Sequence, residues 1–143
     1  MKAHLLLADH AQQESGGKVH ALGLGWTTTR TPTPPQAVVV LLRVPWNETN
    51  TRHRLTLSLV DTDGRPVIVG QGPQGRPQPL QIQHEFEVGR PVGVPAGFEI
   101  EYSLTTQLGP GMPLEAGKVY EWRLDINGVH EDTWRTTFFV RPS

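Results

Sequence analysis

Three stretches of this chain alternate apolar and polar side chains with a period of two, and this pattern most constrains the fold. The stretches are LQIQHEFEV (80–88), FEIEYSLTTQ (98–107) and KVYEWRLDI (118–126). Successive side chains of a β-strand point to opposite faces, so each stretch predicts a strand with one buried and one exposed face. In the third stretch, Trp122 and Leu124 share one face and Arg123 lies on the other.

Further short apolar runs extend this pattern over the chain. They are KAHLLLA (2–8), AVVVLLRV (37–44), HRLTLSLV (53–60) and TWRTTFFV (133–140). The run at 37–44 is apolar on both faces, which predicts a central strand. The dipeptides Asp63-Gly64 and Asn127-Gly128 favour tight hairpin turns. We therefore predict an all-β fold, a single antiparallel β-sandwich domain over residues 1–143 with eight or nine strands, immunoglobulin-like or jelly-roll in topology.

The glycine-rich stretch GKVHALGLGW (17–26) has two interpretations, a phosphate-binding loop or a strand with one bare face. It matches neither the spacing of a Walker loop nor that of a dinucleotide fingerprint. In a strand, Leu22 and Leu24 lie on one packed face, and Gly23 and Gly25 leave the other face bare for close approach of a neighbour. We adopt the strand interpretation.

Two proline-rich stretches predict irregular connections. TTTRTPTPPQ (27–36) has proline too dense for a central strand, and GQGPQGRPQP (70–79) is longer than the usual hairpin loop. Neither stretch separates two segments long enough to be independent domains.

Composition excludes several classes of partner and site. The net charge is −1, so no basic excess exists to bind nucleic acid, and no basic face suggests a membrane surface. Cysteine is absent, which excludes disulfides and thiolate chemistry and fits a reducing compartment. The short apolar run near the N-terminus is interrupted by His4 and Asp9 and does not form a signal peptide. We expect a soluble, cytoplasmic protein.

No pattern in the chain predicts catalysis or a metal centre. Six histidines are present, but no H-x-H, H-x-x-x-H or HExxH spacing occurs. His84 lies in phase with apolar neighbours, as a hydrogen-bonded core or edge histidine does. Outward carboxylate pairs such as Glu85 and Glu87 are typical of a solvated strand face. We expect no enzyme activity, cofactor or bound metal, and treat a histidine-based metalloenzyme as the weakest alternative.

The four tryptophans separate into two kinds. Trp26, Trp122 and Trp134 lie in strand-like stretches and are predicted to belong to the core. Trp46 follows a proline in VPWNETNTRH, a polar loop that also holds Arg52 and His53. An indole on a loop next to charged groups is a frequent anchor of recognition surfaces, so these three residues are the candidate binding site. The alternative is that Trp46 folds back as a lid over the end of the fold.

Several motifs together resemble a known family. They include ADHAQ, the GK-V-H-A-LG-L-GW pattern, VPW-N-E-T-N-T-RH, DTDG-R-PV, FEVGRP and Y-E-W-R-L-D-I-N-G followed by W-R-T-T-F-F-V. In order and spacing they resemble a family of small bacterial proteins, frequent in actinobacteria and catalogued as a domain of unknown function. The resemblance implies a single cytoplasmic β-sandwich domain, and it implies no activity, cofactor or catalytic residue.

We interpret the chain as a non-enzymatic binding or assembly module that acts through contacts with another protein or with itself. Outward Glu, Gln and Thr side chains limit accidental pairing of strand edges and still permit one specific interface. The alternative is a β-sandwich that binds a small molecule or glycan through its end loops around Trp46.

Overall fold

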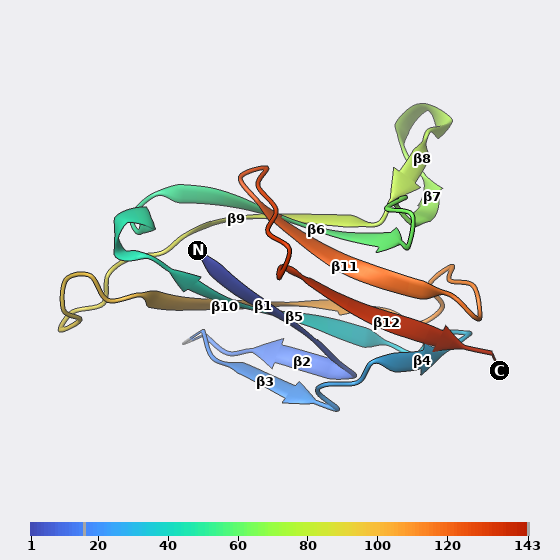
Figure 1. Ribbon diagram of the computed structural model, residues 1–143, viewed down its shortest axis with the longest axis horizontal. Coiled ribbons are helices and arrows are strands. Elements are labelled where there is room, and N and C mark those ends of the chain that lie inside the picture. The colour runs from blue at the N-terminus through green and yellow to red at the C-terminus, as the bar shows by residue number, and fades with distance from the viewer. Residues whose placement is uncertain (16, 143) are drawn as a thin grey trace.

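The computed structural model describes residues 1–15 and 17–142, so residues 16 and 143 of the predicted domain lie outside it. Within those residues it has twelve β-strands, two short 3₁₀ turns and no α-helix, which confirms the all-β prediction (Figure 1). The strands are β1 Lys2–Ala8, β2 His10–Gln13, β3 Val19–Leu22, β4 Thr28–Arg30, β5 Gln36–Val44, β6 Arg52–Asp61, β7 Ile68–Gln71, β8 Pro77–Pro79, β9 Gln81–Glu87, β10 Ile100–Leu108, β11 Val119–Ile126 and β12 Arg135–Arg141. The 3₁₀ turns are η1 Trp46–Glu48 and η2 Pro73–Gly75. The count exceeds the predicted eight or nine because the short strands β2, β4, β7 and β8 form outside the stretches predicted to be strands.

The strands form four sheets. One has three strands in the order β1-β5-β10, and another has five in the order β4-β12-β11-β6-β9. The pairs β2-β3 and β7-β8 are separate hairpins. In Figure 1 the β2-β3 hairpin lies beside β1 and β5, whereas the β7-β8 hairpin projects away from the other strands near β6 and β9. As predicted, the doubly apolar β5 is central in its sheet.

One hydrophobic core lies between the two larger sheets. It takes Leu5, Val40 and Leu42 from the three-stranded sheet and packs them with Trp122 and Leu57 of the five-stranded sheet. Leu55, Leu57 and Leu59 alternate with more exposed neighbours along β6 and are fully buried, as the period-two pattern predicts. The side chains predicted to face inward therefore hold the two sheets together.

A second, smaller apolar cluster lies on the opposite face of the three-stranded sheet. Ala37 and Val39 of β5 pack there with Ala8 and Ala11, and the side chains of the β2-β3 hairpin complete the cluster. The hairpin therefore covers part of the outer face of β5, which explains why that strand is apolar on both faces.

The two predicted hairpin turns form at the expected dipeptides. Asn127 and Gly128 have φ angles of 53° and 80°, the left-handed values that a type I′ turn needs. In the other turn, the Asp61 carboxylate accepts hydrogen bonds from the backbone N–H groups of Asp63 and Arg65, both at 2.9 Å.

The strand observed in residues 17–26 is shorter than predicted, and the prediction that its two glycines lie in a strand is wrong. β3 ends at Leu22, and Gly23 and Gly25 have positive φ angles of 65° and 93° in the turn that follows. Leu22 and Leu24 are exposed and not packed. The positive φ of Gly23 favours glycine, and a Cβ there would also require the Asp9 side chain to move.

The two stretches predicted to be irregular contain regular structure. In the first, β4 pairs in parallel with the end of β12, from Thr28–Phe139 to Arg30–Arg141. In the second, β8 pairs with β7 around the η2 turn. Pairing with a distant strand is not visible in local proline content, and proline is compatible with a strand at an unpaired edge.

Among the described residues, no helix reaches the length and apolar character that crossing a bilayer requires.

Candidate functional site

Trp46 lies in the η1 turn between β5 and β6 and is half-buried. The Arg90 guanidinium lies over its indole, 4.0 Å from the ring centroid, in a cation–π contact. Arg90 also donates through Nη2 to the Trp46 carbonyl at 2.8 Å and through Nε to the Thr49 hydroxyl at 2.7 Å. The loop after β9 thus clamps the β5–β6 connection, and one face of the indole is already occupied.

His53 is buried, and both of its ring nitrogens have partners. Nε2 lies 2.8 Å from the Glu48 carbonyl, and Nδ1 lies 2.9 Å from the side-chain amide nitrogen of Asn127. Because a carbonyl can only accept, Nε2 carries the proton and Nδ1 accepts from Asn127. The ring packs beside Phe86, with 5.3 Å between centroids. These contacts give His53 a structural role in joining the β5–β6 connection, the β11–β12 turn and strand β9.

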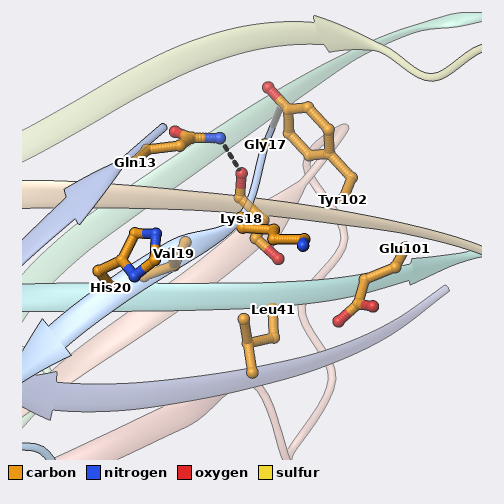
Figure 2. A pocket seen from close by; sticks show the side chains of 9 residues that line it. Gln13, Gly17, Lys18, Val19, His20, Leu41, Glu101 and Tyr102 are labelled. Atoms are coloured by element: carbon orange, nitrogen blue, oxygen red, sulfur yellow. Dashed lines mark hydrogen bonds between the residues drawn. The ribbon is translucent and has the colours of Figure 1, made fainter. Parts of the chain in front are cut away.

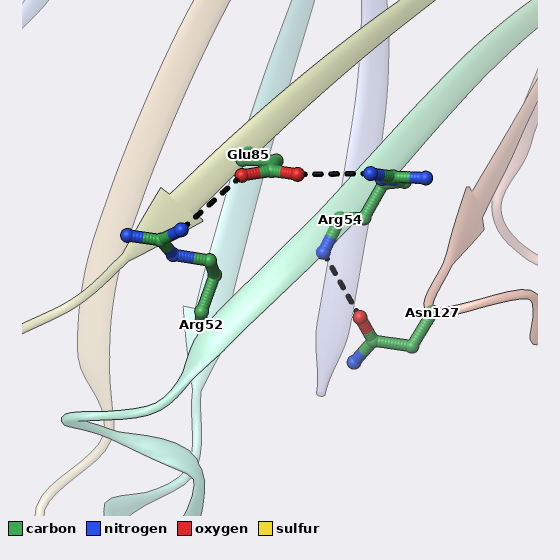
Figure 3. Close-up of polar contacts among 4 residues, drawn as sticks. All are labelled: Arg52, Arg54, Glu85 and Asn127. Atoms are coloured by element: carbon green, nitrogen blue, oxygen red, sulfur yellow. Dashed lines mark hydrogen bonds and ion pairs between the residues drawn. The ribbon is translucent and has the colours of Figure 1, made fainter.

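Arg52 lies on the opposite face of β6 from His53 and points to the exterior. Its Nη1 lies 3.6 Å from one Glu85 oxygen, whereas Arg54 Nη2 donates to the other Glu85 oxygen at 2.9 Å. Figure 3 shows the two arginines on either side of the Glu85 carboxylate. The hydrogen bond from Arg54 is the main cause that lowers the pKa of Glu85, and the charge of Arg52 adds a smaller effect in the same direction. The backbone N–H of Arg54 donates to the side-chain amide oxygen Oδ1 of Asn127 at 2.9 Å.

The structure therefore does not bring the three predicted site residues to one surface. Trp46 and His53 support the β5–β6 end of the fold, and Arg52 belongs to an ion pair on the outer face of β6 and β9. Sequence reasoning missed Arg90, because residues far apart in the chain meet only after β5, β6 and β9 are placed.

A groove of about 560 Å³ lies between the β2-β3 hairpin and the outer face of the three-stranded sheet. Figure 2 shows Leu41 in this groove, with Lys18 and Glu101 nearby. Gln13 crosses the groove, and its amide nitrogen donates to the Ser103 carbonyl at 2.6 Å. The groove thus combines a small apolar floor with single charges of opposite sign, and its polar groups also attach the hairpin to β10.

The edge of β9 is a different kind of surface. β9 is the last strand of its sheet and pairs with β6 in one uninterrupted register from Arg52–Glu87 to Ser58–Gln81. Just before β9, the Leu80 carbonyl accepts from the Leu59 N–H at 3.1 Å, so even-numbered residues pair with β6.

By strand geometry, the odd-numbered residues of β9 point their N–H and C=O groups away from the sheet. These residues are Gln81, Gln83, Glu85 and Glu87. No other strand within the described residues pairs with this edge.

Exposed apolar side chains lie on both segments that flank β9. Before it, Ile68 and Val69 of the β7-β8 hairpin are 44% and 41% exposed. After it, Val92 and Phe98 of the loop over 88–99 are 104% and 55% exposed. Exposed apolar side chains mark an interaction site when they form one contiguous patch, and an interface along β9 would draw on both flanking segments.

The described residues contain no group of three or more His, Asp or Glu side chains placed to hold a metal ion. His84 is exposed and its Nε2 lies 3.0 Å from the Tyr102 hydroxyl, so it makes the predicted hydrogen bond at the sheet edge.

Comparison with known families shows which family the chain belongs to. The chain belongs to the DUF6941 family. The match covers residues 3–141, and the family is described as one of unknown function. This result confirms the resemblance to a domain of unknown function, whereas the bacterial origin stays a prediction. No curated protein and no solved structure matches the chain. Membership of DUF6941 therefore carries no activity or ligand to these residues.

Proposed function

We propose that this DUF6941 chain is a non-catalytic assembly module that binds another protein chain. The observation that carries the proposal is the unpaired β9 edge with exposed apolar side chains on both flanking segments. An open strand edge offers backbone donors and acceptors, and apolar flanks supply the buried area that hydrogen bonds alone do not. A cytoplasmic location belongs to the same proposal.

The finer classification also belongs to this proposal. The core shared by the two larger sheets supports a single sandwich domain of immunoglobulin-like or jelly-roll type. The projecting β7-β8 hairpin and the covering β2-β3 hairpin are additions to that plan.

Site-specific photo-crosslinking tests the assembly function. A photoreactive residue at Val92 should give a discrete protein adduct in native extract or with purified protein. The same residue at Gln12, exposed on the β2-β3 hairpin, is the matched control and should give none. Equal labelling at both positions, or no adduct at either, would contradict the proposal.

The second candidate is binding of a small molecule or glycan around Trp46. Its half-buried indole beside an arginine favours this candidate, since sugars stack on indoles and arginines bind anionic groups. Any such ligand must use the ring face opposite Arg90 or displace the guanidinium. A thermal shift found in a metabolite screen should then disappear in Trp46→Ala, and a shift that persists would exclude this site.

A further inference from the structure

We propose that the partner is a second copy of this chain, and that two β9 strands pair antiparallel about a two-fold axis at His84. This inference rests on the proposed assembly function and specifies its partner and geometry. The paired strands would join two five-stranded sheets into one continuous sheet.

Parity limits the registers that such pairing can use. The outward N–H and C=O groups belong to the odd-numbered residues, so an antiparallel partner must place odd residues opposite odd residues. With the axis at His84, Gln81 lies opposite Glu87, and Gln83 lies opposite Glu85. All four outward residues then find a partner, and each pair exchanges two hydrogen bonds.

Charge complementarity selects the same register. Each outward glutamate faces a glutamine of the other copy, whose amide can donate to the carboxylate. An axis at Glu85 would place two Glu85 side chains directly opposite each other, which is destabilising. An axis at Gln83 would place Glu87 opposite Pro79, which has no N–H to donate.

The flanking segments become neighbours in this arrangement. Antiparallel pairing places the segment before β9 of one copy beside the segment after β9 of the other. Ile68 and Val69 of one copy thereby approach the loop that carries Val92 and Phe98 in the other. Specific interfaces bury roughly 1,200–2,000 Å², more than a short strand edge supplies, so these apolar contacts complete the interface.

Each edge of the three-stranded sheet is bound by another segment at one point or more. On β1, the Leu7 carbonyl accepts from the Gly25 N–H at 2.7 Å. On β10, the Ser103 carbonyl accepts from Gln13 at 2.6 Å.

Single-cysteine crosslinking tests the register without interference, because the chain has no cysteine. In His84→Cys the two thiols meet at the axis, where Cα atoms of a non-hydrogen-bonded pair lie about 4.5 Å apart, within disulfide range. Mild oxidation should give a covalent dimer. Gln83→Cys should crosslink far less, because in this register residue 83 of one copy lies opposite residue 85 of the other. His4→Cys on the edge strand β1 is the matched histidine control and should stay monomeric.

Charge substitutions test the same register by sedimentation equilibrium and keep the native His84. Gln83→Glu places carboxylates opposite Glu85 twice in the dimer and should weaken dimerisation about tenfold. Gln83→Lys should tighten it, whereas an axis at Gln83 would make the lysine variant weaker. Gln12→Lys, exposed on β2, should leave the dimer unchanged.

The outcomes separate this inference from the assembly function. A protein that stays monomeric at high micromolar concentration, with no crosslinking of His84→Cys, overturns the two-fold dimer. If Val92 then still gives a discrete adduct with a different protein, the assembly function survives. A dimer in which Gln83→Cys or His4→Cys crosslinks better than His84→Cys overturns the register.

Discussion

The strands β9 and β10 are both sheet edges on the same side of the core, yet their surroundings differ. Phe86 of β9 and Tyr102 of β10 stack with 4.9 Å between ring centroids, so the two edges lie close together. Within the described residues, no strand pairs with the outer edge of either strand. The β2 segment nevertheless binds the Ser103 carbonyl and the Gln107 side chain of β10.

This difference separates closure of the fold from an interface. A covered edge is a poor template for pairing with another chain, and the contacts from the β2 segment cover part of β10. The odd-numbered residues of β9 are glutamines and glutamates. In antiparallel pairing of two β9 strands, their charges favour the register with the axis at His84. We infer that the outer edge of β9 is the interface, and that the face of the three-stranded sheet under the β2-β3 hairpin contributes to stability.

The largest expected difference in the free energy of unfolding is between alanine substitutions of two valines. Val39 is buried under the β2-β3 hairpin, and Val39→Ala should lower the free energy of unfolding by about 2 kcal/mol through lost burial and a cavity. Val92→Ala should change it by less than about 0.5 kcal/mol because Val92 is exposed. Urea denaturation measures both. Equal losses would show that Val92 is packed in solution and would remove the contrast.

A smaller difference in stability is expected between alanine substitutions of Gln107 on β10 and of Gln83 on β9. The Gln107 amide oxygen accepts from the Ala11 N–H at 3.3 Å, and its nitrogen donates to the Gln36 carbonyl at 3.2 Å. Gln107→Ala should therefore cost about 1 kcal/mol of stability. Gln83→Ala on β9, measured at concentrations below dimerisation, should be nearly neutral. A larger loss for Gln83 than for Gln107 would reverse the assignment of the two edges.

The smallest effect concerns the pH dependence of Glu85. Because Arg54 lowers the pKa of this carboxyl, its ion pair contributes at pH above the ordinary carboxyl range. The contribution is lost as pH falls through the lowered pKa. In an NMR titration, Arg54→Gln should raise the pKa of Glu85 more than Arg52→Gln, since Arg52 lies farther away at 3.6 Å. An equal rise in both variants would contradict the geometry of Figure 3.

Period-two alternation predicted the strands that form the core, because burial of one face requires that pattern. The buried Trp122 and Leu124 follow from it directly. The same pattern misplaced Leu24, since alternation shows which side chains share a face and not whether a second layer covers it. The close approach of Asp9 to Gly23 joins residues far apart in the chain, which the local sequence does not show.

The candidate site was harder to predict than the fold. A tryptophan in a polar loop is visible in sequence, but the guanidinium that covers Trp46 comes from Arg90 on a different connection. Neighbouring residues of a strand point to opposite faces, so Arg52 and His53 could not both join one surface once β6 began at Arg52. The open edge of β9 could not be predicted, because sequence does not show which strands lack a neighbour.

Residue-resolved hydrogen exchange of β9 at two protein concentrations tests the central claim most directly. The amides of Gln83 and Glu85, which point away from the sheet, should exchange fast in dilute protein and become protected as concentration rises. The amides of His84 and Phe86, which face β6, should be protected throughout. If Gln83 and Glu85 exchange fast at concentrations where the protein is dimeric, β9 is not the interface.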